Sequence, residues 1–311
     1  MLHGFFMLHT HDASDAIDDA MEASAAGVRA VKFSLAGLGV TALLQAVVVV
    51  VSGSVALLAD TIHNFSDALT AIPLWIAFVI GRRAASRRYT YGYGRIEDLA
   101  GLFIVAMIAL SAVVAGWESI RRLLDPHPPT QLGWLLAAGL IGCAGNELVA
   151  AYRIHVGRRI GSAALVADGV HARTDGLTSL AVVLGTIGVW LGFPLADPIV
   201  GLLISAAIFA LLWGSARDIG RRLLDGVDPQ LVIEAEQAVR AVPGVVDVDE
   251  VRMRWIGHRL SVEATVTTDP TMPVATFHEL EHQSDKLIRR ILPSIASVRL
   301  TTSTHAQPAN H

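Results

Sequence analysis

Residues 164–178 read ALVADGVHARTDGLT, and residues 56–70 read ALLADTIHNFSDALT. The two stretches align without gaps and are identical at eight of fifteen positions. Chance can supply shared Ala and Leu in apolar segments, but it rarely supplies the pattern Asp-x-x-His-x-x-x-Asp twice. The match therefore indicates an internal repeat, and its shared element is a stripe of ionisable side chains at helical spacing.

Both copies of the repeat lie inside long apolar stretches. A stretch of about 20 mostly apolar residues is long enough to cross a hydrocarbon layer of about 30 Å. The chain holds six such stretches, at residues 28–51, 54–80, 97–123, 132–154, 162–191 and 194–219. Only 17% of the 311 residues are charged, against about 25% in a soluble globular domain. The sequence therefore predicts a polytopic α-helical membrane protein with six transmembrane helices.

The two copies occur in the second and fifth predicted spans, three crossings apart. They therefore run in opposite directions through the membrane, and an inverted repeat of three helices is typical of secondary transporters. Thirteen Lys and Arg residues near the span ends, Arg153 among them, fall on one side, while only Arg121 and Arg122 fall on the other. This bias predicts that both termini lie in the cytoplasm, and we expect a multi-pass protein of the inner (plasma) membrane. Residues 1–27 are acidic rather than basic and apolar, so no cleavable signal peptide is evident.

The composition changes after residue 222, where the predicted spans end. Residues 223–229 read LLDGVDP, as expected for a linker. Beyond it, helical periodicity covers 230–241 and 273–292, and strand patterns cover a bulged stretch at 246–253, the alternating stretch 260–266 and a third stretch at 298–302. This αββαβ order predicts a small two-layer α+β domain of ferredoxin-like type. The expected organisation is a cytoplasmic tail (1–27), a transport domain (28–222), the linker, a cytoplasmic α+β domain (230–304) and a tail (305–311).

The repeated stripe has the composition of a metal site. Positions i, i+3 and i+7 of a helix fall within an arc of about 60°, so each copy presents Asp, His and Asp along one face. His63 and His171 both lie near the membrane midplane, where unpaired ionisable groups are costly. A divalent cation offsets that cost, because His63, Asp67, His171 and Asp175 supply two imidazole nitrogens and two carboxylate oxygens in a tetrahedral set. Such mixed ligands suit Zn²⁺ and, less distinctively, Co²⁺, Fe²⁺ or Cd²⁺.

The sequence leaves two questions about the stripe open. Its ionisable groups can also pair with one another as interhelical hydrogen bonds, without any metal. The outer members, Asp60 and Asp168, either relay ions or protons or orient the neighbouring imidazole. Cys143 is the only cysteine of the chain, so a thiolate site for soft metals is excluded.

Two other interpretations belong to different functional classes. An intramembrane zinc hydrolase needs three ligands, a water and a carboxylate base, but the chain lacks His-Glu-x-x-His and all four candidate ligands form a closed set. A metal sensor anchored by its spans would not need charged stripes at the midplane. The net charge of −4 argues against a nucleic-acid partner. We therefore expect a transporter and not an enzyme, with divalent cations, protons and the lipid bilayer as its partners and no prosthetic group.

Several motifs together resemble the cation diffusion facilitator family of metal cation and proton antiporters. They are the stripe from Asp60 to Asp67, Tyr91-Gly-Tyr-Gly-Arg95-x-Glu97, Ala167-Asp168-x-x-His171-x-x-x-Asp175-x-x-x-Ser179, and Asp197-Pro198-Ile199. The resemblance covers nearly the whole chain. It implies a homodimer with one four-ligand site per protomer, alternating access, and metal efflux from the cytoplasm in exchange for protons. The His and Asp pair on both helices resembles the zinc-transporting branch, with Fe²⁺, Co²⁺ or Cd²⁺ as the alternative main substrate.

The C-terminal domain departs from the pattern of that family. Its members often place metal-binding His residues on the second and third strands, where this chain has Ala264 and about Thr301. Four residues remain as weak regulatory metal candidates: Asp249, His258, His278 and His282. The last two lie at i and i+4 of a predicted helix and can share a metal. The N-terminal His residues are expected to lie in a disordered tail.

The sequence also predicts the orientation of three further residues in the predicted spans. Asn146 and Glu147 are adjacent in the fourth span, so only one of them can point toward the bundle interior. Arg173 lies about 200° around the helix from His171, and we expect it to extend toward the cytoplasmic interface.

Overall fold

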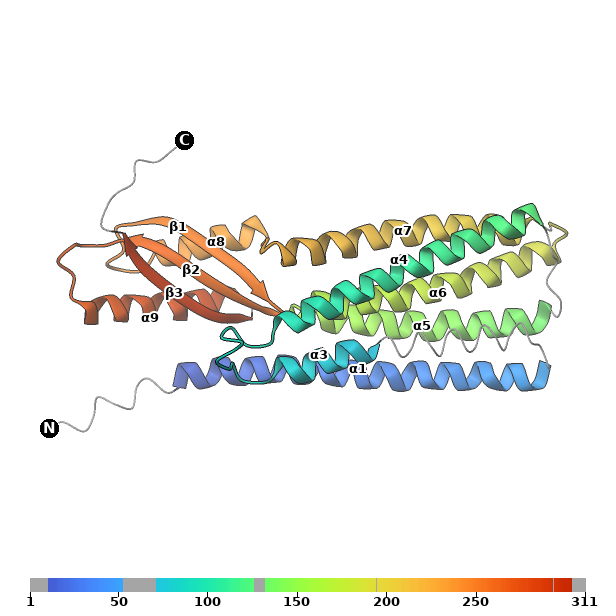
Figure 1. Ribbon diagram of the computed structural model, residues 1–311, viewed down its shortest axis with the longest axis horizontal. Helices are drawn as coiled ribbons and strands as arrows, with labels where there is room; N and C mark the ends of the chain where they lie inside the picture. The colour runs from blue at the N-terminus through green and yellow to red at the C-terminus, as the bar shows by residue number, and fades with distance from the viewer. Residues whose placement is uncertain (1–10, 53–70, 126–131, 194, 293, 304–311) are drawn as a thin grey trace. The chain divides into compact units, whose positions relative to one another are not determined.

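The computed structural model describes residues 11–52, 71–125, 132–193, 195–292 and 294–303 (Figure 1). Its elements are α1 (His11–Ser52), α3 (Ala71–Gly81), α4 (Arg95–Leu124), α5 (Leu132–Ile160), α6 (Ala163–Trp190), α7 (Ala196–Leu223), α8 (Pro229–Arg240), β1 (Asp247–Ile256), β2 (Arg259–Thr267), α9 (Val274–Ile291) and β3 (Ile295–Ser303). The chain divides into two compact units, residues 25–219 and a second unit that contains residues 220–303.

Four helices of the described chain are long and apolar enough to cross a membrane. They comprise residues 25–51, 95–124, 132–160 and 196–223. These segments coincide with the first, third, fourth and sixth predicted spans. The shorter apolar helix α3 forms the end of the second predicted span, and residues 54–70 of that span lie outside the described residues. The prediction of a polytopic helical membrane protein is confirmed.

The fifth predicted span forms α6, a helix of 28 residues that contains no stretch both as apolar and as free of charge as those in the other four helices. The cause is the polar stripe, whose side chains are buried inside the bundle. Polar residues buried on α6 are Asp168, His171, Thr174, Asp175, Ser179 and Thr186. A helix whose polar side chains are buried must face other helices, because lipid offers no hydrogen-bond partners. We conclude that α6 is an interior helix of its unit.

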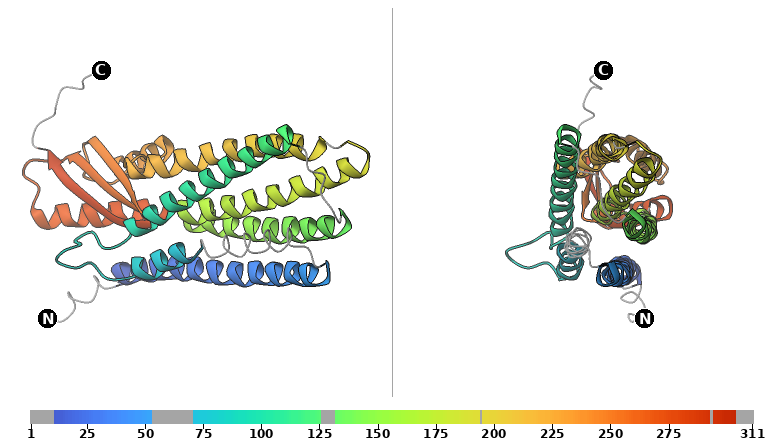
Figure 2. Two further views of the ribbon diagram at one scale, coloured as in Figure 1. Left: turned by 45° about the vertical axis from the view of Figure 1, so that its right-hand side comes forward. Right: turned by 90° about the vertical axis from the view of Figure 1, so that its right-hand side faces the viewer.

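Helices α5 and α6 lie side by side along their length (Figure 2). The turn between them places Gly161 at a φ of +72°, in the left-handed region that favours glycine. Ser162 then caps α6, because its hydroxyl oxygen accepts a hydrogen bond from the Leu165 N–H at 3.1 Å. Small residues allow α5 and α6 to approach each other closely. A Cβ added at Gly169 of α6 would lie 2.7 Å from Cγ1 of Ile154 on α5.

Two helix boundaries differ from the sequence prediction. The first helix begins at His11, although residues up to 27 were expected to form a tail. Residues 11–27 contain six Ala residues, and Ala is the residue that most favours helix. Helix α5 continues to Ile160, beyond the expected end at Ile154. Arg153 therefore lies inside a helix with 2% of its surface exposed, and counting it among the interfacial arginines was wrong.

The C-terminal domain has the predicted αββαβ order. Strand β1 pairs antiparallel to β2, and β2 pairs parallel to β3. Helix α8 contacts β1, while α9 contacts both β3 and α8, so two helices and one sheet form two layers. The alternating side chains of β2 are buried in the core, at Leu260, Val262, Ala264 and Val266. The register of β1 shifts between Val248 and Glu250, which confirms the expected bulge.

Candidate metal site

The described half of the predicted ligand set lies on one buried face of α6. His171 is 1% exposed and Asp175 is 8% exposed. The Nδ1 atom of His171 lies 3.9 Å from Oδ1 of Asp175, one helical turn farther along. Within the described ranges, neither ring nitrogen of His171 has a hydrogen-bond partner. Two buried nitrogens without a partner are costly in a membrane interior, and this is the condition that a bound cation would relieve.

The other half of the predicted ligand set belongs to the second predicted span. His63, Asp67 and Asp60 lie within residues 53–70, outside the described residues. No group of three or more His, Cys, Asp and Glu side chains is arranged to hold a metal in the part of the chain that the structure describes. The four-ligand site therefore stays a prediction, of which α6 contributes one imidazole and one carboxylate.

Other polar side chains of α6 near His171 and Asp175 form hydrogen bonds with the backbone of the helix. Thr174 and Thr178 donate hydrogen bonds to the backbone carbonyl oxygens of Val170 and Asp175, at 3.0 and 2.8 Å. Their hydroxyl groups are thus satisfied within the helix itself. The next turn adds Ser179, which is 8% exposed. The polar face of α6 thus continues one turn beyond the ligand pair.

An ion pair that sequence reasoning missed lies next to the ligand pair. Arg153 Nη1 of α5 lies 3.0 Å from Oδ2 of Asp168 on α6, and both side chains are buried. Counting from the turn at Gly161, Arg153 lies eight residues before it and Asp168 seven after it. Opposite charges at nearly equal distances before and after the turn between two helices are the sequence signal that would have predicted this pair.

A second ion pair links the same two helices at the surface of the bundle. Arg173 donates to both carboxylate oxygens of Glu147, at 3.0 Å from Nε to Oε2. This pairing replaces the expected extension of Arg173 toward the interface. Asn146 is 5% exposed, whereas the carboxylate of Glu147 lies outside, so one of the two adjacent residues points inward as expected.

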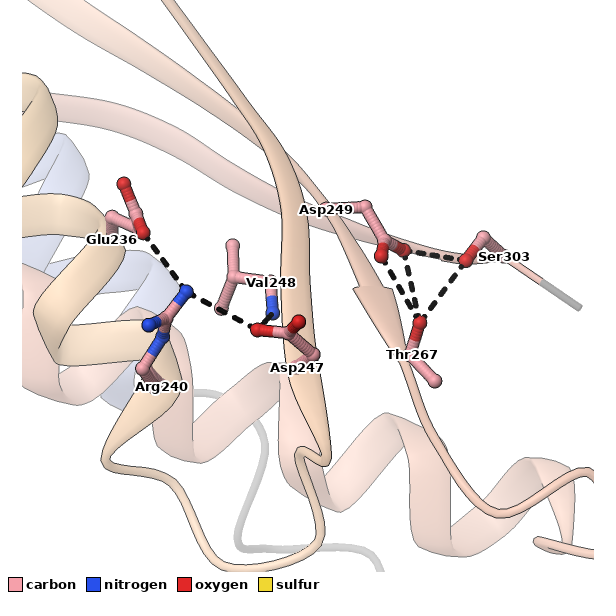
Figure 3. A network of polar contacts seen from close by, with 7 residues as sticks. All are labelled: Glu236, Arg240, Asp247, Val248, Asp249, Thr267 and Ser303. Atoms are coloured by element: carbon pink, nitrogen blue, oxygen red, sulfur yellow. Dashed lines mark hydrogen bonds and ion pairs between the residues drawn. The ribbon is translucent and has the colours of Figure 1, made fainter. Parts of the chain in front are cut away.

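The candidate metal residues of the C-terminal domain are spread over several elements. The bulge in β1 directs Asp249 toward Thr267 and Ser303, and its carboxylate accepts hydrogen bonds from both hydroxyl groups (Figure 3). His278 is largely exposed and lies 3.5 Å from Glu281 on its own helix. His258 is buried in the hairpin between β1 and β2. A regulatory metal at these residues or at His282 stays a prediction.

Comparison with known proteins decides the family. Residues 31–224 match the family model of the cation efflux transmembrane domain, and residues 227–300 match that of the cation efflux protein, cytoplasmic domain. This chain belongs to the cation efflux family. The resemblance to cation diffusion facilitators is thereby confirmed. Cation efflux proteins are transporters, so the hydrolase interpretation falls, and the chain is a membrane protein that moves a metal cation.

Curated relatives agree with this assignment. A probable cation efflux system protein of Mycobacterium tuberculosis is 59% identical over 311 residues, which cover 100% of this chain and 92% of the relative. The magnetosome protein MamB of Paramagnetospirillum magneticum is 26% identical over 84% of this chain and 88% of its own. The zinc transporter ZitB of Pectobacterium atrosepticum is 29% identical over 77% of this chain and 72% of its own.

Proposed function

We propose that this cation efflux protein exports Zn²⁺ from the cytoplasm in exchange for protons. The observation that carries the proposal is the buried pair of His171 and Asp175, with two imidazole nitrogens that have no hydrogen-bond partner among the described residues. We assign the remaining two ligands to His63 and Asp67, whose sequence repeats the same spacing. Two imidazoles and two carboxylates suit four-coordinate Zn²⁺. The relative that is named a zinc transporter supports this choice of substrate.

Proton exchange follows from the chemistry of these ligands. A metal binds imidazole and carboxylate only in their deprotonated forms, so loading of the site displaces protons. Imidazole has an ordinary pKa of about 6.5, so a modest difference in pH between the two sides changes its occupancy by protons. We infer that His63 and His171 carry protons in the return step. Rocking of one helix group against the other would expose the site to each side in turn.

The proposed setting is a homodimer in the plasma membrane with both termini in the cytoplasm. The arginines near the span ends support this orientation, since Arg158, Arg159, Arg221 and Arg222 still fall on the side predicted to be cytoplasmic. The match of residues 227–300 to the cytoplasmic domain of cation efflux proteins supports placing the C-terminal domain on that side.

Transport into proteoliposomes tests the proposal. The full-length protein is reconstituted under an imposed pH gradient, and uptake of Zn²⁺, Cd²⁺, Co²⁺, Fe²⁺ and Mn²⁺ is measured together with proton flux. We expect Zn²⁺ uptake that depends on the gradient and is abolished by His171→Ala. The matched control is His155→Ala, which removes an exposed imidazole of α5. Undiminished uptake by His171→Ala would remove this residue from the site, and a preference for Fe²⁺, Co²⁺ or Cd²⁺ would establish the alternative substrate.

A further inference from the structure

Three ionisable side chains share the buried face of α6, but their partners differ. His171 and Asp175 face each other at 3.9 Å on the same helix. Asp168, one turn before His171, instead lies 3.0 Å from the guanidinium of Arg153 on α5. Of the two carboxylates that flank His171, the one on Asp168 thus forms an ion pair with Arg153.

Helix geometry shows why this engagement matters. Side chains three residues apart have Cβ atoms about 5–6 Å apart, so Asp168 and His171 are neighbours on the helix surface. A carboxylate at that separation can reach an ion bound to the imidazole of His171. In the described chain, neither oxygen of Asp168 meets the geometry of a hydrogen bond, and the contact with Arg153 is an ion pair only. Asp168 therefore keeps lone pairs that could bind a cation if the guanidinium were absent.

The position of Arg153 is fixed by its surroundings. The residue is 2% exposed, so it cannot turn into water, and its charge is permanent because guanidinium does not lose its proton in proteins. The α5 and α6 backbones approach closely here, as the contacts at Gly169 and Ile154 show. Asp168 is the acidic partner that the described residues offer to Arg153. The ion pair is thus built into the interface of the two helices.

We propose that Arg153 is a residue that determines metal specificity. By holding Asp168, it removes one carboxylate from the coordination sphere of a cation at His171 and Asp175. The site then offers few oxygen ligands, which favours Zn²⁺ in four-coordination over Mn²⁺, a cation that prefers oxygen ligands in octahedral sites. This inference rests on the proposed function and adds a role for a residue outside the predicted ligand set. It also answers the open question about Asp168, which acts as the partner of Arg153 and neither relays ions or protons nor orients the imidazole of His171, whose nitrogens have no hydrogen-bond partner among the described residues.

The test compares Zn²⁺ and Mn²⁺ transport by the full-length protein in proteoliposomes. Arg153→Met removes the charge and keeps the length of the side chain, which leaves Asp168 available. We expect the ratio of Mn²⁺ to Zn²⁺ transport efficiency to rise by roughly tenfold or more over that of the unsubstituted protein, as one added oxygen ligand would change relative affinity. Arg153→Lys keeps the charge and should keep the original ratio. Arg153→Met with Asp168→Asn has no carboxylate to free, and its ratio should also stay close to the original.

Further variants keep the inference testable if Arg153→Met does not fold. Arg153→Gln removes the charge but keeps a polar N–H group on the side of α5 that faces Asp168, and it should raise the ratio by a smaller factor. Binding of Mn²⁺ to the detergent-solubilised protein, measured by calorimetry, gives a readout that does not depend on flux. An unchanged ratio in Arg153→Met, or in Arg153→Gln if Arg153→Met does not fold, would overturn the role of Arg153. If His171→Ala still abolishes Zn²⁺ uptake in that case, only the specificity inference fails and the proposed transport site stands.

Discussion

Helices α6 and α7 both contain 28 residues, yet they occupy opposite environments. Fourteen residues of α6 are buried, among them Asp168, His171 and Asp175, whereas α7 buries five. On α7 the large apolar side chains of Leu203 and Trp213 are exposed at the bundle surface. Apolar content qualifies α7 as a membrane span and does not qualify α6. A long apolar stretch with few charges therefore marks the helix that is exposed at the bundle surface, whereas charged residues interrupt the helix that carries the candidate metal ligands.

The largest expected effect is on Zn²⁺ uptake, when one carboxylate is removed from α6 and, for comparison, one from α7. Asp175→Asn on α6 should lower Zn²⁺ uptake by at least about 100-fold, because loss of a ligand exceeds the effect of losing a residue that only orients one. Asp218→Asn on α7 removes an exposed carboxylate and should leave uptake close to that of the unsubstituted protein. Initial rates in proteoliposomes measure both. Equal losses in the two variants would contradict the contrast between the helices.

The next prediction compares a buried with an exposed ion pair between α5 and α6. Asp168→Asn leaves the guanidinium of Arg153 buried without a counter-charge, which should lower the free energy of unfolding by about 3–5 kcal/mol. Glu147→Gln breaks the exposed pair with Arg173 and should lower it by about 0–1 kcal/mol. Denaturation in detergent, followed by circular dichroism, measures both variants. A similar loss in each would mean that burial does not control the strength of these pairs.

Packing gives a third contrast between the helices. A side chain at Gly169 of α6 would meet the backbone carbonyl oxygen of Ala150 at 3.1 Å, whereas Gly214 of α7 has no atom within 4 Å of an added Cβ among its described neighbours. Gly169→Leu should separate α5 from α6 and cost about 1–3 kcal/mol of unfolding free energy or more. Gly214→Leu should be tolerated. The yield and melting temperature of the detergent-solubilised protein report both, and a tolerated Gly169→Leu would refute the close contact.

The smallest expected effect concerns the start of α6. Ser162→Ala removes the hydroxyl that accepts the N–H of Leu165, and it should cost about 1 kcal/mol of unfolding free energy. Ser162→Asn keeps an acceptor at the same place and serves as the control. Thermal melts should therefore rank Asn above Ala at this position. The reverse order would show that the cap does not stabilise α6.

Periodicity and repeat matching predicted much of this molecule. The bounds expected for α6 and β2 lie within a few residues of the observed ones, and the bulge at Asp249 was anticipated from a break in alternation. The ionisable stripe placed His171 and Asp175 on one buried face, because helical spacing is a local property of the chain. A local pattern of this kind is readable without any knowledge of neighbouring helices.

The missed features depend on contacts between elements. Arg153 was counted as an interfacial charge because its own segment carries no sign of burial, and its environment is set by Asp168 on the next helix. The pairing of Arg173 with Glu147 likewise needs the relative rotation of α5 and α6, which the sequence of either helix alone does not contain. The start of α1 at His11 was missed because the acidic residues of this segment were interpreted as a tail, although its Ala residues favour helix.

The symmetry of charges about Gly161 has a consequence for how the protein is made. A lone Arg or Asp in a membrane-spanning helix is costly on insertion into a bilayer, by up to about 2.5–3.5 kcal/mol at the helix centre. Arg153 and Asp168 face each other across one tight turn, so each can reach the membrane already neutralised by the other. Helices α5 and α6 would then leave the translocation machinery as a single hairpin. Membrane insertion of this protein would thus depend on Arg153 and Asp168, neither of which is a proposed ligand of the transported metal.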